Sequence, residues 1–159
     1  VTIVIIKKDL LSRSSDDLAT MLNYKVHAES DSLYNTPPTY AIYISMLVFR
    51  WLDSLGGVEE IYKLNKEKAS LLYDFIDNSS FFKGNVDKRY RSLMNVTFST
   101  PSKDLDSLFV KEAEKHGLVN LAGHKSAGGL RASIYNAMPV EGVRALVDFM
   151  KDFELKYSK

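Results

Sequence analysis

Three basic side chains surround a pair of glycines in the stretch LAGHKSAGGLRASIYN, which covers Leu121–Asn136. They are His124, Lys125 and Arg131. The planar guanidinium of an arginine can bind a carboxylate or a phosphate through two parallel hydrogen bonds, and a loop lysine or histidine adds adjustable positive charge. Two anionic groups on one small ligand would suit this set better than one. Gly128 and Gly129 would let the backbone pass close to such a ligand.

The pattern of residues 130–135 predicts the direction in which Arg131 points. Apolar and polar side chains alternate along this segment, which is typical of a half-buried strand. If helices cover the apolar face of the strand, the guanidinium of Arg131 lies on the opposite face of the sheet. It is then near the loop that carries His124 and Lys125.

Each of these basic residues also has an ordinary structural interpretation. Arg131 could belong to an ion pair, His124 could be a hydrogen-bonded loop histidine, and Lys125 could be a solvated lysine. A phosphate-binding P-loop is excluded by spacing, because His124 separates Gly123 from Lys125 and Leu118 occupies the place of the upstream glycine.

The composition narrows the class of protein. The chain has 159 residues, of which 45% are hydrophobic, and 21 Lys and Arg residues against 20 Asp and Glu residues, which is the composition of roughly one globular domain. A net charge of +1, with basic residues spread along the chain, argues against nucleic acid as a partner. The absence of cysteine and the scatter of the three histidines exclude disulfides and structural zinc.

A membrane segment is also not expected. The longest apolar run, Ala41–Leu52, is interrupted by Ser45 and Arg50 and is too short to span a bilayer. No charged and then apolar leader opens the chain. We therefore expect a soluble, cytoplasmic protein.

The opening run VTIVII is typical of a strand that is buried on both faces of a parallel sheet. Such a strand needs neighbours on each side, and the remaining sequence has few strands of that kind, so the chain is expected to begin inside a domain. An antiparallel edge strand, or a short strand of a self-contained fold, is the alternative. Residues 7–32 are polar and weakly patterned, which favours a surface connection.

A helix is expected within the stretch YNTPPTYAIYISMLVFRWLDSLGG, with Thr36 as its cap, prolines at its first positions, and Gly56 and Gly57 at its end. The apolar residues between Ala41 and Leu52 cover nearly every face of this helix. A helix that is apolar all round must be buried between layers or between subunits.

The second half of the chain has the pattern of a small α/β sandwich. The expected elements are a helix over Val58–Ile76, a strand over Leu93–Ser99, a helix over Lys103–His116, a strand over Leu130–Tyr135 and a helix over Glu141–Leu155. The apolar stripe of the first helix is Val58, Ile61, Leu64, Leu72 and Phe75, with Glu59 and Lys63 paired on its wet side. This order predicts helices on one face of a short-stranded sheet.

Several separated motifs together carry a family resemblance. GHKSAGGLRASIYNAMP, with YNTPPTYAIY, FRWLDSLGG, RSLMNVTF and the leading VTIVIIKKDLL, resembles the C-terminal part of the phosphoserine aminotransferase family, which consists of class V, fold-type I pyridoxal-phosphate enzymes. The resemblance covers essentially the whole chain, and the motifs occur in the family's order. It implies an α/β fold in which residues 1–60 are a remnant of the large cofactor-binding domain and residues 61–159 are the small C-terminal domain.

The resemblance also implies roles for five residues. Arg131 would bind the α-carboxylate of the substrate. His124 and Lys125 would contact the phosphate of the substrate side chain, although the family more usually has arginine in place of Lys125. Asn35 and Thr36 would reach the cofactor phosphate of the neighbouring subunit across a homodimer interface.

The implied reaction is pyridoxal-phosphate-dependent transamination between glutamate and 3-phosphohydroxypyruvate, which gives 2-oxoglutarate and phosphoserine in serine biosynthesis. The Schiff-base lysine of the family is expected upstream of Val1, so this chain would hold substrate-recognition residues without the catalytic lysine. Two alternatives stay open. One is another aminotransferase or desulfurase of the same fold, and the other is an isolated, non-catalytic domain that binds anions or dimerises.

Overall fold

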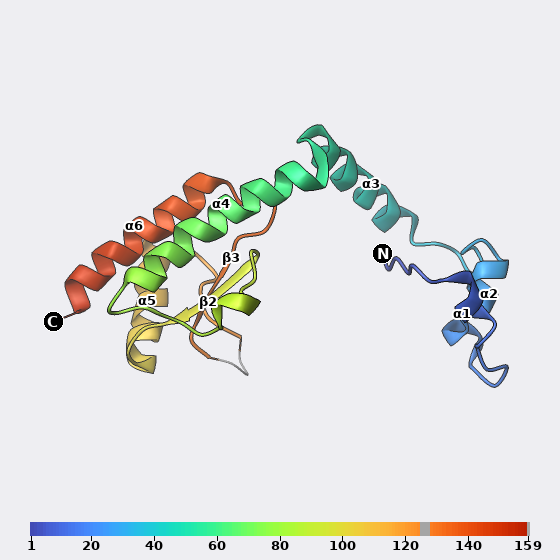
Figure 1. Cartoon of the computed structure of the whole chain (residues 1–159), viewed down its shortest axis with the longest axis horizontal. Coiled ribbons are helices and arrows are strands. Elements are labelled where there is room, and N and C mark those ends of the chain that lie inside the picture. Colours follow the sequence, from blue (N-terminus) through green and yellow to red (C-terminus); the bar gives the residue numbers. More distant parts are fainter. Residues whose placement is uncertain (125–127, 159) are drawn as a thin grey trace. The chain divides into compact units, whose positions relative to one another are not determined.

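The computed structural model describes residues 1–124 and 128–158 of the chain. The chain divides into two compact units, Val1–Ser54 and Leu55–Lys159 (Figure 1).

The first unit contains only helices among its regular elements. They are α1 (Lys8–Leu11), the 3₁₀ turn η1 (Thr20–Leu22), α2 (Tyr24–Glu29) and α3 (Thr39–Ser54). The side chain of Asn23 caps α2 by accepting a hydrogen bond from the backbone N–H of Lys25 at 3.0 Å. The stretch expected to be a plain surface connection, residues 7–32, therefore contains three short helical segments.

The strand expected over VTIVII is not formed, and this prediction was wrong for the structure described. Residues 1–7 belong to no helix or strand, and Val1–Ile6 are exposed, with Ile5 at 96%. A strand exists only when its backbone groups are paired with those of a neighbouring strand. The described part of the first unit contains no other strand, so the apolar pattern has no partner there.

Helix α3 forms where the sequence predicts it, but it begins later than expected. Its first residue is Thr39, so Thr36 does not cap it. The reason is local: Thr36 and Pro37 each precede a proline, and a residue before proline is disfavoured in the helical region. Gly56, with φ of 96°, follows the end of the helix in the expected way.

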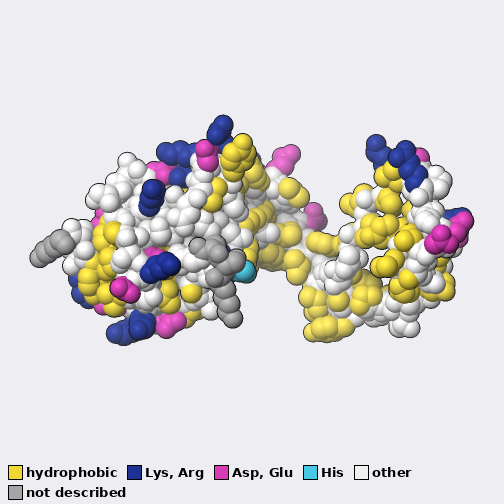
Figure 2. Space-filling model, turned by 90° about the horizontal axis from the view of Figure 1, so that it is seen from below, with side chains coloured by type: hydrophobic (Ala, Val, Ile, Leu, Met, Phe, Trp, Pro, Cys, Tyr) yellow, Lys and Arg dark blue, Asp and Glu magenta, His cyan; other side chains and the backbone are white. Residues whose placement is uncertain are grey.

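None of the 16 residues of α3 is buried within the described structure. Figure 2 shows yellow hydrophobic side chains spread over the visible face of the unit Val1–Ser54. No single helix in the described part of the chain is long and apolar enough to span a membrane, and α3 and α4 meet that criterion only if they are counted as one broken segment.

The second unit is built on a three-stranded antiparallel sheet. Its strands are β1 (Lys83–Gly84), β2 (Asn95–Ser99) and β3 (Leu130–Ser133), in the order β1-β2-β3. In the central pairing, Val96 lies opposite Ala132 and Thr97 lies opposite Arg131. The predicted alternation of apolar and polar side chains along these strands is therefore confirmed, since the apolar residues Val96 and Ala132 are buried. The short strand β1 was not predicted.

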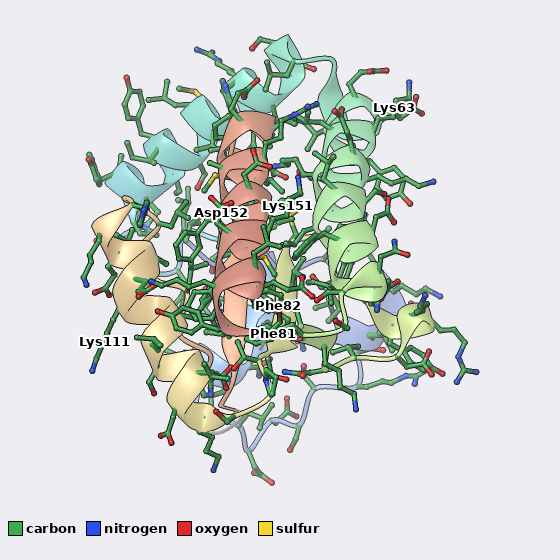
Figure 3. All side chains as sticks on the ribbon, turned by 90° about the vertical axis from the view of Figure 1, so that its left-hand side faces the viewer. Lys63, Phe81, Phe82, Lys111, Lys151 and Asp152 are labelled. Carbon is green, nitrogen blue, oxygen red and sulfur yellow. The ribbon has the colours of Figure 1, made fainter. Side chains whose placement is uncertain are left out.

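Three helices cover the apolar face of this sheet, as predicted. They are α4 (Gly57–Asn78), α5 (Lys103–Lys115) and α6 (Val140–Tyr157). A separate 3₁₀ turn, η2 (Lys88–Tyr90), precedes β2. Helices α4 and α6 lie side by side in both ribbon views (Figures 1 and 3). Strand and helix residues form one buried cluster, in which the rings of Phe98, Phe109 and Phe153 are packed edge to face. Figure 3 shows Phe81 and Phe82, which join this cluster, beside the end of α6.

The buried face of α4 differs from the predicted stripe in two ways. Val58 is 86% exposed, whereas the polar residues Asn65 and Lys68 are buried. On the exposed side, Lys63 forms its ion pair at 2.6 Å with Glu60 and not with Glu59.

Candidate functional site

A groove of about 1010 Å³ lies against the face of the sheet that the helices leave uncovered. Its floor comes from the polar positions of β2 and β3, because these alternate with the buried ones. Among its lining residues are Asn95, Ser102, Gly123, His124, Arg131 and Tyr135.

Arg131 projects from β3 into this groove. Its position is fixed by strand pairing, since its backbone N–H donates to the carbonyl of Leu121 at 2.8 Å and its Cα lies opposite Thr97 on β2. Its Nε atom is buried and has no hydrogen-bond partner within the part of the chain that the structure describes. Among the same residues, no carboxylate lies within ion-pair distance of Arg131. The salt-bridged structural interpretation of Arg131 is therefore not supported.

His124 lies on the rim of the same groove, in a loop whose two ends are tied together. The N–H of Gly123 donates to the carbonyl of Gly129 at 2.9 Å, and the N–H of Gly128 donates to the carbonyl of His124 at 2.8 Å. The structure thus brings His124 and Arg131 to one groove. Lys125, the third basic residue of the sequence cluster, lies outside the described residues.

The tightest backbone approach in this loop is at Gly123, which the sequence analysis did not single out as a close contact. A Cβ atom at position 123 would lie 2.0 Å from the carbonyl oxygen of Gly128. Gly128 and Gly129 have φ of 68° and 66°, so both adopt the left-handed conformation that glycine tolerates best. The glycines are therefore required to close the loop that holds His124.

Asn95 fixes the polar floor of the groove. Its Oδ1 accepts hydrogen bonds from the hydroxyl of Ser133 at 3.2 Å and from the hydroxyl of Tyr135 at 3.1 Å. Because one side of the amide is occupied in this way, its orientation is set, and the NH₂ group is the part of Asn95 left to donate. Asn95 was not among the predicted site residues, although the same alternation that found Arg131 places it on this face.

The N-terminus of α5 forms one wall of the groove. The hydroxyl of Ser102 caps this helix by accepting from the N–H of Leu105 at 3.2 Å. Asp106 is also on this wall, and its Oδ1 accepts hydrogen bonds at 2.8 Å from both the N–H and the hydroxyl of Thr100. The carboxylate of Asp106 therefore has an internal structural role.

The residues expected to contact a cofactor lie in the other unit. Asn35 and Thr36 are exposed, and the Nδ2 of Asn35 donates to the backbone carbonyl of Thr36 at 3.2 Å. The structure does not place them relative to the groove. No group of His, Asp or Glu side chains in the described parts of the chain could hold a metal ion.

The groove can thus bind an anion through a strand-borne guanidinium, with a histidine and polar donors around it. The unit is therefore a small α/β sandwich, with helices on one face of the sheet and a polar groove on the other. The family model of class V aminotransferases matches residues 1–146, and the chain belongs to this family.

Curated relatives carry a more specific name. A phosphoserine aminotransferase from Marinomonas sp. is 56% identical over 157 residues, which cover 99% of this chain and 44% of the relative. One from Bacillus cereus is 54% identical over 155 residues, which cover 98% of this chain and 43% of the relative. The chain therefore spans less than half the length of the curated relatives that it matches.

Solved structures agree with this comparison. A phosphoserine aminotransferase from Bacillus circulans subsp. alkalophilus superposes with a TM-score of 0.91 and 47% identity, over 95% of this chain and 42% of that chain. A pyridoxal-phosphate-bound phosphoserine aminotransferase from Trichomonas vaginalis superposes with a TM-score of 0.86 and 39% identity, over 92% and 42% of the two chains. The fold is that of part of a fold-type I pyridoxal-phosphate enzyme, as predicted.

Proposed function

We propose that this chain is the C-terminal, substrate-recognising part of a phosphoserine aminotransferase. The proposed enzyme transfers the amino group of glutamate to 3-phosphohydroxypyruvate and gives 2-oxoglutarate and phosphoserine, in serine biosynthesis. One observation carries the proposal: Arg131 has a buried Nε without a hydrogen-bond partner among the described residues, and it lies in a polar groove with His124. A carboxylate ligand would supply the missing acceptor.

In this proposal the two ends of the ligand are bound by different residues. Arg131, held rigidly on β3, binds the α-carboxylate that all of these substrates share. His124 and Lys125 bind the phosphate of the phosphorylated substrates. Because a lysine ammonium is a point charge, Lys125 would attract a phosphate without the two parallel hydrogen bonds of an arginine. Together they orient the α-carbon of the substrate.

Pyridoxal phosphate is the cofactor of the proposed enzyme, and when bound it supplies an electron sink for negative charge at the substrate α-carbon. Asn35 and Thr36 are the residues of this chain proposed to hold its phosphate in a neighbouring subunit. They are exposed and offer an amide and a hydroxyl, which are neutral hydrogen-bond donors suited to a phosphate oxygen. The proposal assigns no Schiff-base lysine to this chain and expects it upstream of the segment that matches Val1.

We also propose that the chain contributes to two domains and to a dimer interface. Residues 1–60 would belong to the large cofactor-binding domain and residues 61–159 to the small C-terminal domain. The exposed apolar surface of α3 supports a homodimer, because a helix with no buried residue and many apolar ones requires a partner surface. We propose a cytoplasmic location, with no nucleic acid or membrane as partner.

The test is ligand binding by the 159-residue chain. Titration calorimetry is carried out with glutamate and with O-phosphoserine, on the unmodified chain and on Arg131→Gln and Lys125→Ala variants. Charge-assisted hydrogen bonds contribute roughly 1.5–3 kcal/mol, so Arg131→Gln should weaken both ligands by about 10- to 150-fold. Lys125→Ala should weaken O-phosphoserine far more than glutamate. In a full-length enzyme with this segment, Arg131→Ala should impair both half-reactions and Lys125→Ala mainly the reaction of the phosphorylated substrate.

Matched controls come from the same unit. Arg89→Gln removes a guanidinium that is 76% exposed and paired with Asp87, and Lys111→Ala removes an exposed lysine of α5 (Figure 3). Neither should change the affinity for either ligand. Equal losses for glutamate and O-phosphoserine in Lys125→Ala would refute the division of roles and would favour a related aminotransferase of the same fold. Binding of inorganic phosphate as tight as that of O-phosphoserine would favour a non-catalytic anion-binding domain.

A further inference from the structure

Lys68 of α4 is completely buried, with an exposed fraction of 0%. Its ammonium group donates hydrogen bonds to three backbone carbonyls, those of Ile134 at 3.3 Å, Tyr135 at 2.8 Å and Met138 at 3.0 Å. No carboxylate among the described residues forms an ion pair with Lys68. Lys63 of the same helix, in contrast, points to solvent (Figure 3).

An ammonium group in this position has a cost that an apolar side chain would not have. Removing the charge from water disfavours the protonated form, and this desolvation lowers the pKa of Lys68. A methionine or leucine would fill similar space without that penalty. The ammonium has three N–H donors and each meets a carbonyl, which is the arrangement that makes burial of the charge tolerable.

The three carbonyls belong to the segment that leaves β3 and enters α6. This segment contains a turn in which the N–H of Met138 donates to the carbonyl of Tyr135 at 2.9 Å. A second tie comes from the same face of α4, where the Nδ2 of Asn65 donates to the Oδ1 of Asn136 at 2.8 Å. The turn is therefore held to α4 through side chains of Lys68 and Asn65.

The turn contributes one lining residue of the groove, Tyr135. Tyr135 is its first residue, and its hydroxyl donates to Asn95, which forms the groove floor. Displacement of the backbone at Tyr135 would move both the tyrosine ring and the amide orientation of Asn95. It would also release the end of the strand on which Arg131 lies.

We propose that Lys68 is a positioning residue for the groove: its ammonium binds the carbonyls of Ile134, Tyr135 and Met138 and so fixes Tyr135 and Asn95 relative to Arg131. Lys68 does not touch the ligand. The consequence for ligand affinity rests on the proposed function of the groove, whereas the consequence for the turn does not.

The experiment compares Lys68→Met with Lys66→Met, which makes the same change at an exposed position of the same helix. Amide hydrogen exchange is measured by NMR on the whole chain, and affinity is measured with glutamate and O-phosphoserine. In Lys68→Met the Met138 amide should exchange at least about tenfold faster than in Lys66→Met, with the Val96 amide of β2 changed much less. Both ligands should bind about tenfold or more weakly, since small displacements of binding groups have effects of up to roughly 10²-fold.

A variant in the core separates positioning from a general loss of stability. Met150→Ala removes a fully buried side chain of α6 and leaves the hydrogen bonds from Lys68 to the turn carbonyls available. It should speed exchange of core amides such as Val96 and leave the affinity for both ligands within about twofold. An unchanged Met138 amide in folded Lys68→Met, or equal affinity losses in Met150→Ala and Lys68→Met, would overturn the proposal.

The unmodified chain gives a test that needs no variant. If Lys68 holds the turn, the Met138 amide exchanges as slowly as the Val96 amide, and fast local exchange at Met138 overturns the proposal even if Lys68→Met does not fold. If the unmodified chain binds neither ligand, the proposed function fails, and the exchange rates still decide whether Lys68 positions the turn.

Discussion

The ion pair between Asp77 and Arg91 provides a direct test of how this unit is stabilised. The guanidinium of Arg91 donates two hydrogen bonds to the carboxylate of Asp77, at 2.9 and 2.6 Å, and also lies 4.4 Å from the centre of the Tyr73 ring. Asp77 is near the end of α4, and Arg91 precedes β2, so the pair joins a helix to the sheet. The perturbation is Asp77→Asn, which keeps the shape of the side chain and removes its charge.

The size of the effect follows from burial. The side chains of Asp77 and Arg91 are 24% and 14% exposed, so solvent screens the pair less than it screens a surface pair. A charge-assisted hydrogen bond contributes roughly 1.5–3 kcal/mol, and after a discount for the remaining exposure we expect a loss of about 2 kcal/mol. For a chain of this length that corresponds to a decrease in Tm of roughly 4–8 °C. The matched control is Asp87→Asn, because Asp87 pairs with Arg89 at an exposed site that solvent screens, so its loss should lower Tm much less.

The same pair predicts a pH dependence. The hydrogen bonds from Arg91 and Lys88 hold the pKa of Asp77 well below its usual range. A carboxyl group whose pKa is lowered by folding stabilises the folded state fully above its unfolded pKa of about 4, and that stabilisation is lost as the pH falls toward the folded pKa. The difference in stability between the unmodified chain and Asp77→Asn should therefore be constant from pH 7 to about pH 5 and should shrink below about pH 4.

The assay is thermal unfolding followed by the NMR signals of the buried residues Val96 and Phe98, which report on this unit alone. Equal unfolding temperatures for Asp77→Asn and Asp87→Asn at pH 7 would refute the argument from burial. A difference that persists unchanged at pH 2 would refute the assignment of the effect to the charge of Asp77.

Three further changes test other parts of the structure. Ser102→Ala removes the hydroxyl that caps α5 and should cost about 1 kcal/mol in thermal unfolding; an unchanged Tm would contradict the capping role. Gly123→Ala places a Cβ atom 2.0 Å from the carbonyl oxygen of Gly128, so it should open the loop and shift the amide NMR signals of its neighbours, and an unchanged spectrum would refute the required close approach. Phe109→Ala empties the centre of the aromatic cluster and should cost roughly 3–5 kcal/mol in denaturant unfolding, whereas a loss below about 1 kcal/mol would show that the neighbouring rings refill the space.

Much of the second unit could be predicted from the sequence because its signals are local. The alternation of apolar and polar residues over 130–135 predicted which side chains of β3 are buried, and hence the face of the sheet on which Arg131 lies. Helices α5 and α6 were found within two residues of their ends, and Gly117, with φ of 77°, directly follows the predicted end of α5. Periodicity, caps and glycines are properties of neighbouring residues, so a single sequence contains them.

The failures involve partners that are distant along the chain. VTIVII has the composition of a buried strand, but strand formation depends on a second strand, which the described part of its unit does not contain. Lys68 was not recognised, because a lysine is ordinarily solvated. The available signal was its place on the buried stripe of α4, between Ile61 and Leu72, where Asn65 is a second polar residue. Two polar side chains on an apolar stripe indicate buried hydrogen bonds, although the sequence does not say to which backbone.

The exposed surface of α3 has a spectroscopic consequence. Trp51, the only tryptophan of the chain, lies on this helix and is 39% exposed, whereas the buried aromatic residues in the core of the other unit are phenylalanines and Tyr73. Excitation at a wavelength that only tryptophan absorbs therefore gives fluorescence from Trp51 alone, which lies in the unit Val1–Ser54. Its emission should shift to shorter wavelength whenever an apolar surface covers α3, at concentrations where a second copy or another polypeptide binds there. The chain thus contains its own optical probe for any partner that binds α3, in the unit that does not contain the groove.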